Sequence, residues 1–262
     1  MNKIIFTDID GTFWNEKYYA GNNYKYIREL TKNNIIVFFI SSRTFEELNY
    51  LNSKIKTVCP FIGENGNFIF FPNKFQQVLT KKWNNEYIRL GRLREDFFDT
   101  YLEIKNKFKD CLIDLKSLSL KEYSKLCGYS VADAKRSINR RYSYLFKFNG
   151  TQKQLKKINE FTRMHNLQIQ YGGKFLSLSA KSDKVHALKF IKKKFSKNII
   201  FAIGNSDNDY KMLKYSDVSF IIINENMQYC EKLIKIKNII KIPEPAPNGW
   251  EHFKNSVLRF NI

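Results

Sequence analysis

Short continuous runs of apolar residues, each followed by polar residues, mark the buried strands of this chain. The runs cover residues 4–6, 35–40, 199–203 and 218–223. Strands that are buried on both faces of a parallel sheet have this pattern, whereas half-exposed strands alternate apolar and polar residues. Between the first two runs, Tyr26, Ile27 and Leu30 recur at helical spacing. The N-terminal segment therefore predicts a strand, a helix over residues 23–32 and a second, parallel strand.

The middle of the chain has a different pattern. Residues 90–108 predict an amphipathic helix, and residues 144–148 and 167–171 predict more polar strands. We therefore expect an α/β fold, in which an α+β cap domain is inserted into a Rossmann-like parallel-sheet core. The expected core comprises residues 1–80 and 181–262, and the expected cap comprises residues 81–180.

The net charge of the chain is strongly positive, with 45 Lys and Arg residues against 25 Asp and Glu residues. Such an excess suits a nucleic-acid binder, because clustered basic residues release counterions from phosphates. Here the basic residues are dispersed, and the run at residues 192–194 lies on a helical pattern. We interpret the charge as a compositional bias that also attracts an anionic substrate. Nucleic-acid binding is the weaker alternative, and we expect no nucleic-acid partner.

Neither a disulfide framework nor a membrane segment is expected. The four cysteines lack a C-x-x-C spacing and follow no signal peptide, so we expect reduced, buried thiols. No apolar run approaches the roughly 20 residues that span a bilayer. These features predict a cytoplasmic protein without a membrane partner.

The strongest chemical signal follows the first apolar run, in the sequence Asp8-Ile9-Asp10-Gly11-Thr12. Open parallel sheets bind ligands at the carboxyl ends of their strands. Residues two apart in a strand share a side, so Asp8 and Asp10 can converge on one metal ion and one phosphoryl group, and Gly11 lets the chain turn sharply. The alternative is an Asp-Gly turn with two solvated carboxylates.

A second polar loop follows the third apolar run in the same way. Its sequence is Gly204-Asn205-Ser206-Asp207-Asn208-Asp209. Such oxygen ligands suit a hard cation such as Mg²⁺. Taken alone, this loop is equally well a helix cap, since Asn and Asp also satisfy free backbone donors. Two such loops in one chain favour chemistry over capping.

Two further elements could bind phosphate. Ser41 and Ser42 follow the second apolar run with a hydroxyl and loop amides, and Arg43 offers a guanidinium to an anionic substrate. A helix cap explains the serines equally well. Lys184 precedes a helical pattern and could balance the charge of a phosphate, although most lysines are merely solvated.

Together these four elements resemble the motifs of the haloacid dehalogenase superfamily of phosphatases, which occur in this order on successive strand ends. The spacing of the last loop and the large insertion resemble the Cof-type branch, which has an α+β cap and mostly contains sugar-phosphate phosphatases. The resemblance implies that Asp8 is the nucleophile and Asp10 the general acid and base of a Mg²⁺-dependent phosphomonoester hydrolase. It implies metal ligation by Asp8, Asp10, Asn205 and Asp209, and phosphate binding by Ser41, Ser42, Lys184 and Asn208.

A closer likeness is to the mannosyl-3-phosphoglycerate phosphatases. It rests on Ser41-Ser42-Arg43-Thr44, Glu64-Asn65-Gly66, Arg141-Tyr142-Ser143, Gly172-Gly173-Lys174-Phe175 and Asn248-Gly249-Trp250. The chain departs from that family at Asn205, Val185 and Ser177, where Asp, Gly and His are usual. The likeness implies a glycosyl-3-phosphoglycerate substrate, a small anionic phosphorylated metabolite. Its candidate contacts are Arg43, Glu64, Asn65, Arg141 and Lys174.

Two alternatives stay open on the same scaffold: a broader sugar-phosphate phosphatase and a phosphomannomutase-like enzyme. Trp250 is a candidate to pack on a sugar face, although an aromatic residue of this kind is more often a core or lid residue.

Overall fold

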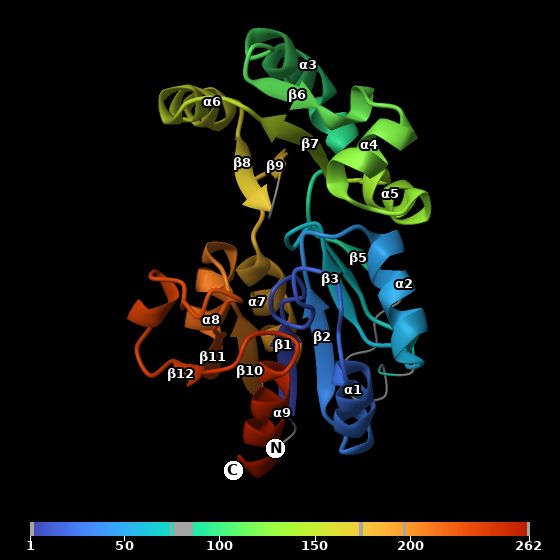
Figure 1. The fold of residues 1–262 in the computed structure, drawn as a ribbon, viewed down its shortest axis with the longest axis vertical. Helices are drawn as coiled ribbons and strands as arrows, with labels where there is room; N and C mark the ends of the chain where they lie inside the picture. Colours follow the sequence, from blue (N-terminus) through green and yellow to red (C-terminus); the bar gives the residue numbers. More distant parts are fainter. Residues whose placement is uncertain (1–2, 74, 76–85, 173–174, 196–197, 261–262) are drawn as a thin grey trace. The chain divides into compact units, whose positions relative to one another are not determined.

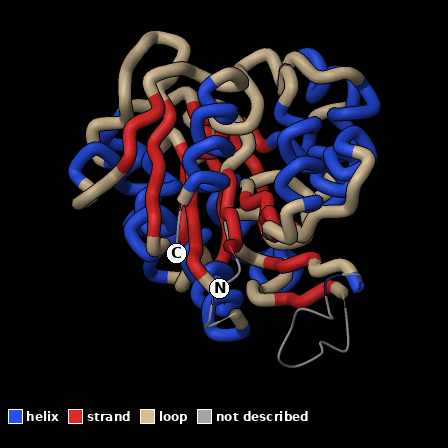
Figure 2. The backbone as a smooth tube through the Cα atoms, turned by 90° about the horizontal axis from the view of Figure 1, so that it is seen from below, coloured by secondary structure: helices blue, strands red, loops and turns tan. Residues whose placement is uncertain are grey.

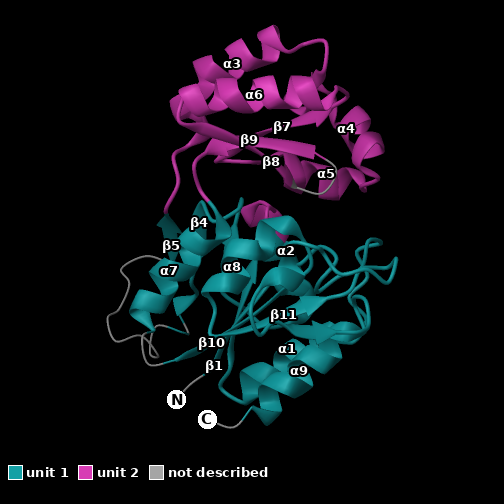
Figure 3. Ribbon diagram, turned by 90° about the vertical axis from the view of Figure 1, so that its left-hand side faces the viewer, with its two compact units in different colours: residues 1–41, 48–89, 183–262 teal, residues 42–47, 90–182 magenta. Residues whose placement is uncertain are grey.

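The chain forms two compact units. The computed structural model describes residues 3–73, 75, 86–172, 175–195 and 198–260. The first unit comprises residues 1–41, 48–89 and 183–262, and the second comprises residues 42–47 and 90–182 (Figure 3).

The core continues past residue 80, where the sequence placed its end. Strand β5 (Tyr87–Arg89) pairs with β4 (Phe68–Phe70) as the last strand of the core sheet. The pairing puts Ile69 opposite Ile88 and Phe68 opposite Arg89. The pairing of β5 with β4 therefore sets the end of the core, and the hydrophobic pattern of the sequence does not reveal such a pairing.

An eight-stranded sheet forms the centre of the first unit (Figure 1). Its strands, in spatial order, are β12 (Ile240–Ile242), β11 (Val218–Ile222), β10 (Ile199–Gly204), β1 (Lys3–Thr7), β2 (Ile36–Ile40), β3 (Phe61–Gly63), β4 and β5. All pairings from β12 to β3 are parallel, and β4 and β5 are antiparallel additions.

Strand β1 occupies the place where the strand order reverses. The chain first builds β2 and β3 on one side of β1, and later builds β10, β11 and β12 on the other. Ligands bind at such a switch point, beside the carboxyl ends of the strands. The loops after β1, β2 and β10 therefore meet at one edge of the sheet.

Helices flank this sheet. They are α1 (Asn23–Lys32), α2 (Phe45–Ile55), α7 (Lys184–Lys194), α8 (Tyr210–Tyr215) and α9 (Gly249–Arg259), with 3-10 turns η4 (Asp207–Asp209) and η5 (Leu233–Lys235). Helix α1 packs against α9, and α7 packs against α8. Helix α1 has the bounds that the apolar spacing predicted, because Tyr26, Ile27 and Leu30 are its buried face.

The second unit contains a four-stranded antiparallel sheet with helices. Its strands, in spatial order, are β6 (Leu112–Asp114), β7 (Ser143–Phe148), β9 (Phe175–Ala180) and β8 (Leu167–Gly172). Its helical segments are η2 (Arg94–Phe97), α3 (Phe98–Lys107), η3 (Leu115–Ser117), α4 (Leu120–Cys127), α5 (Val131–Ile138) and α6 (Gln152–Met164). The strands of both sheets are red in Figure 2.

The helix predicted at residues 90–108 is shorter in the structure. A 3-10 turn comes first, and the α-helix begins only at Phe98. The carboxylate of Asp96 accepts a hydrogen bond from the backbone N–H of Leu93, which closes the 3-10 turn. The inserted α+β character that the sequence predicted is observed in this unit.

The cysteine and membrane expectations have separate outcomes. All four cysteines are free thiols, and three of them are buried. Cys230 is partly exposed, so the expectation of four buried thiols is wrong at that position. Within the described ranges, no helix has the length and apolar character that crossing a membrane requires.

Candidate active site

The loop after β1 places Asp8 at the switch point of the core sheet. The backbone N–H of Asp8 donates to the carbonyl of Ile203 on β10 at 3.1 Å, so the nucleophile candidate stays in register with the neighbouring strand. Gly11 has a φ of +74°, and a Cβ at this position would lie 2.2 Å from Asn205 Nδ2. Glycine therefore allows the loop after β1 to approach the loop after β10 closely.

A buried ion-pair cluster lies at this sheet edge. Lys184 Nζ donates to Asp8 Oδ1 and, at 2.6 Å, to Asp209 Oδ1. The three side chains are at most 8% exposed, and they come from the first residue of α7, the loop after β1 and η4. The structure thus brings together three of the residues that the sequence proposed for phosphate and metal binding.

Burial and mutual charge perturb the titration of this cluster. Burial, with the neighbouring Asp209 carboxylate, raises the pKa of Asp8 to about 7, against the lowering effect of Lys184. Burial alone would lower the pKa of Lys184, but Asp209 and Asp8 outweigh it and raise the pKa above its ordinary value. Lys184 is therefore a permanent cation beside a carboxylate whose charge depends on pH near neutrality. Strongly perturbed groups of this kind are typical of functional sites.

The loop after β10 presents an amide oxygen that has no protein partner. Asn205 Oδ1 is buried and accepts no hydrogen bond from any described residue. A buried polar oxygen without a donor is costly, and a cation would satisfy it. Asp10 is exposed at the same edge. The oxygen atoms of Asp8, Asp10 and Asn205 therefore fit a hard cation such as Mg²⁺, although no group of three acidic, His or Cys side chains gathers among the described residues.

Asp209 serves mainly to hold this loop and Lys184. Its Oδ2 atom accepts from the backbone N–H groups of Asn205 at 3.0 Å and Ser206 at 3.2 Å, and its Oδ1 atom accepts from Lys184. Because both oxygens have protein donors, Asp209 is less suited to bind a cation directly than Asn205. The sequence assigned metal ligation to both residues.

Ser41 lies at the end of β2, where a strained turn contacts it. The carbonyl of Ser41 accepts from the backbone N–H of Asn65 at 3.0 Å, and Ser41 is 1% exposed. Glu64, Asn65 and Gly66 have consecutive positive φ angles of 42°, 59° and 96°. A Cβ at Gly66 would lie 2.3 Å from the carbonyl oxygen of Asp183, so the turn also lies against the start of α7. Backbone strain of this kind often accompanies a functional site.

The other predicted contacts belong to the second unit or have protein partners. Arg43 forms an ion pair with Glu47 at 2.9 Å, and the half-exposed Arg141 forms one with Glu46 at 3.5 Å. The carbonyl of Ser42 accepts from the guanidinium of Arg140 at 2.5 Å. These pairs weaken the case for Arg43 and Arg141 as binders of a carboxylate.

Three further candidates are Asn208, Lys174 and Trp250. Asn208 is exposed, and its Oδ1 atom accepts from the hydroxyl of Ser206 at 2.8 Å. Lys174 lies outside the described residues. Trp250 is fully buried, edge-on to Phe13 and Phe253, so it is a core residue, which was the more usual of the two roles considered for it. Its aromatic surface is needed inside the core.

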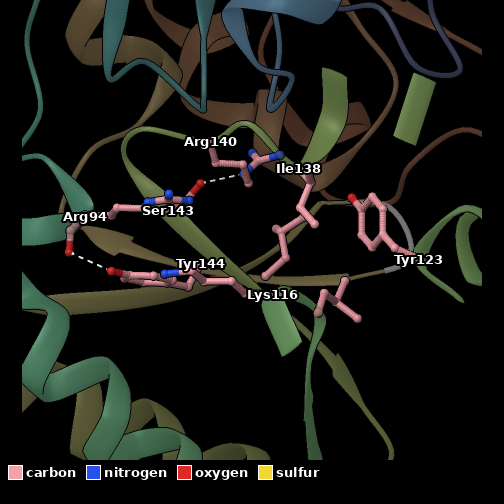
Figure 4. A pocket seen from close by; sticks show the side chains of 9 residues that line it. Arg94, Lys116, Tyr123, Ile138, Arg140, Ser143 and Tyr144 are labelled. Atoms are coloured by element: carbon pink, nitrogen blue, oxygen red, sulfur yellow. Dashed lines mark hydrogen bonds between the residues drawn. The ribbon is translucent and has the colours of Figure 1, made fainter. Parts of the chain in front are cut away.

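The second unit contains a small pocket that the sequence did not reveal. Arg94, Lys116 and Arg140 line it together with Tyr144 (Figure 4). The guanidinium of Arg94 and the ammonium of Lys116 each lie 5.6 Å from the ring centre of Tyr144. Arg140 is 7% exposed, and its Nε–H donates to the Ser143 hydroxyl at 2.7 Å. Arg94, Lys116 and Arg140 are distant from one another in the sequence, so only the fold brings them together.

The sequence and the fold are those of a hydrolase family. Residues 5–236 match the model of the haloacid dehalogenase-like hydrolases, and the chain belongs to this family. It is a phosphomonoester hydrolase of the haloacid dehalogenase superfamily. The family expected from the four motifs is thereby confirmed.

Individual relatives extend over nearly the whole chain. A glucosyl-3-phosphoglycerate/mannosyl-3-phosphoglycerate phosphatase of Persephonella marina is 28% identical over 257 residues, which are 94% of each chain. A mannosyl-3-phosphoglycerate phosphatase of Pyrococcus furiosus is 26% identical over 92% of this chain and 99% of its own. A crystal structure of a Streptococcus mutans protein superposes with a TM-score of 0.73 at 19% identity, covering 99% of this chain and 100% of that one. The structural match confirms the α/β fold with its insertion.

Proposed function

We propose that this hydrolase is Mg²⁺-dependent, forms an aspartyl phosphate on Asp8 and removes phosphate from a glycosyl-3-phosphoglycerate in the cytoplasm. The observation that carries the proposal is the buried contact of Lys184 with Asp8 at the carboxyl end of the central strand. A lysine in that position holds the carboxylate and offers positive charge to an incoming phosphoryl group. A purely structural ion pair would explain the contact, but not its place at the switch point of the sheet.

In the first step, an oxygen of Asp8 attacks the phosphorus atom as the bond to the leaving oxygen breaks. Asp10 donates a proton to that leaving oxygen, and its exposed position suits exchange with substrate and water. In the second step, water attacks the phosphorus of the aspartyl phosphate while Asp10 accepts a proton from it. Inorganic phosphate leaves, and both carboxyl groups return to their starting states.

Phosphoryl transfer demands positioning and neutralisation of charge more than covalent help from the protein. Lys184 supplies one fixed positive charge. Ser41 is a candidate to bind phosphate oxygens at the neighbouring strand end. When bound by the oxygens of Asp8, Asp10 and Asn205, Mg²⁺ would supply further positive charge to the phosphoryl oxygens.

The substrate class is supported by the names of the relatives and by charge. Two relatives that cover more than nine-tenths of the chain are named as phosphatases of glycosyl-3-phosphoglycerates. Such a substrate carries a carboxylate beside its phosphate. The net charge of +20 suits a small doubly acidic metabolite.

Phosphate release from a panel of substrates tests the proposal. The panel holds mannosyl-3-phosphoglycerate, glucosyl-3-phosphoglycerate and simple hexose phosphates, with and without Mg²⁺, for wild type and Asp8→Asn. We expect Mg²⁺-dependent release from a glycosyl phosphoglycerate that the variant loses. Preference for hexose phosphates would replace the substrate with a broader sugar-phosphate class, and transfer to a second sugar position would indicate a mutase. Full activity of Asp8→Asn would exclude the aspartyl phosphate.

A further inference from the structure

A buried chain of two hydrogen bonds leads from the C-terminal helix to the backbone of Asp8. The indole Nε1–H of Trp250, on α9, donates to the Thr7 hydroxyl at 3.1 Å. That hydroxyl in turn donates to the carbonyl oxygen of Asp8 at 2.8 Å. Thr7 and Trp250 are both 0% exposed, so water does not compete for either bond.

The direction of this chain is fixed by chemistry. An indole N–H can only donate, so the Thr7 oxygen must accept from Trp250. The hydroxyl proton is then directed to its other partner, the Asp8 carbonyl. One hydroxyl thus connects a side chain of α9 with the peptide group that follows Asp8.

The peptide groups on both sides of Asp8 are therefore held. On one side, its N–H donates to the Ile203 carbonyl at 3.1 Å. On the other side, its carbonyl accepts from Thr7. The next carbonyl, that of Ile9, accepts from the N–H groups of Phe13 and Trp14, both at 2.9 Å. Rotation of the peptide between Asp8 and Ile9 would change the course of the backbone after Asp8, and so the position of the Asp8 carboxylate relative to Asp10.

We propose that Thr7 and Trp250 are positioning residues for the Asp8 carboxylate. The proposal rests on Asp8 being the nucleophile proposed above. In-line attack requires the attacking oxygen to be placed within a fraction of an ångström, and a small misplacement by a distant residue lowers the rate strongly. Packing alone does not account for the arrangement, because the ring contacts of Trp250 with Phe13 and Phe253 need no N–H group.

The test uses full-length variants loaded with Mg²⁺. Thr7→Val keeps the shape of the side chain and removes the hydroxyl, whereas Thr7→Ser keeps the hydroxyl. Thr162→Val is the matched control, because Thr162 is also 0% exposed and its hydroxyl donates to the Asn159 carbonyl at 3.0 Å, on α6 of the second unit. Hydrolysis of para-nitrophenyl phosphate gives kcat and KM, and thermal unfolding gives Tm.

We expect Thr7→Val to lower kcat by about tenfold to a hundredfold with an unchanged KM. Thr7→Ser should restore kcat, and Thr162→Val should lower Tm as Thr7→Val does but leave kcat unchanged. A purely structural role predicts instead that Thr7→Val lowers Tm and leaves kcat at the wild-type value. That result would overturn the proposal.

A binding measurement separates this proposal from the proposed function. Beryllium fluoride imitates the phosphoryl group on an aspartate, and calorimetry measures its binding without turnover. We expect at least tenfold weaker binding, in the presence of Mg²⁺, to Thr7→Val and Trp250→Phe, and unchanged binding to Thr162→Val. Equal binding to all variants would overturn the positioning role. A different result would overturn both the positioning role and the proposed function: wild type fails to bind beryllium fluoride, and Asp8→Asn keeps full activity. In that case Asp8 is not the nucleophile on which the positioning role rests.

Discussion

Replacing Lys184 with Met tests the electrostatics of the buried site directly. The Lys184 side chain is 2% exposed and contacts the carboxylates of Asp8 and Asp209, which are 8% and 0% exposed. Methionine has a similar length and no charge, so the two carboxylates would remain together in a nearly dry site. Removing one partner of a buried ion pair costs about 3–5 kcal/mol, because the remaining charge is uncompensated. We expect the free energy of unfolding to fall by about that amount near pH 8 without Mg²⁺.

The pH dependence of this loss follows from the pKa of Asp8. Burial and Asp209 raise that pKa to about 7, and Lys184 opposes the rise. Without Lys184 the pKa must rise further. A carboxyl group that has a higher pKa in the folded state than in the unfolded state binds its proton more tightly when the protein is folded. Its contribution to the free energy of unfolding therefore rises as the pH falls from the folded-state pKa toward the unfolded-state pKa. The loss in Lys184→Met should therefore be smaller near about pH 5.5 than near about pH 8.

Urea unfolding followed by circular dichroism measures these differences. Lys254→Met is the matched control, because Lys254 is also buried and contacts a carboxylate, that of Glu29, at 3.0 Å. Glu29 is 41% exposed, so this pair contributes only about 0–1 kcal/mol. Equal losses for the two variants, or a loss in Lys184→Met that is the same at both pH values, would refute the reasoning.

Three further predictions concern the metal, a turn and the second unit. In the proposed site, Mg²⁺ binds the ionised form of Asp8, and burial raises the pKa of that residue to about 7. We therefore expect the Mg²⁺ affinity, measured by calorimetry, to fall about tenfold per pH unit below that pKa and to level off above it; a constant affinity would contradict this. Gly66→Ala should lower kcat more than Gly128→Ala. Both glycines have a positive φ, but only at Gly66 would an added Cβ meet the backbone, at 2.3 Å from the carbonyl oxygen of Asp183. Equal kcat values for the two variants would count against that contact. Tyr101→Phe removes the hydroxyl that donates to the buried carboxylate of Asp114. It should lower the free energy of unfolding by about 1–3 kcal/mol and leave kcat in the phosphatase assay unchanged. A lower kcat would contradict a purely structural role for Tyr101.

Hydrophobic pattern alone predicted much of the core. The continuous apolar runs became β1, β2, β10 and β11, and the spacing within residues 23–32 became α1. These elements are predictable because each buries a face that its own sequence defines. The boundary at residue 80 failed because β5 joins the sheet by pairing with β4, and its residues are only half-buried or exposed.

The sequence by itself determined the class of fold, the hydrolase family and the pair of acidic residues after the first strand. Only the tertiary structure decided which charged groups meet. It joined Lys184 to Asp8 across 176 positions of the chain, and it buried Trp250 as a hydrogen-bond donor to Thr7. The physical reason is that strand and helix formation depend on neighbours in sequence, whereas charge pairing and desolvation depend on neighbours in space.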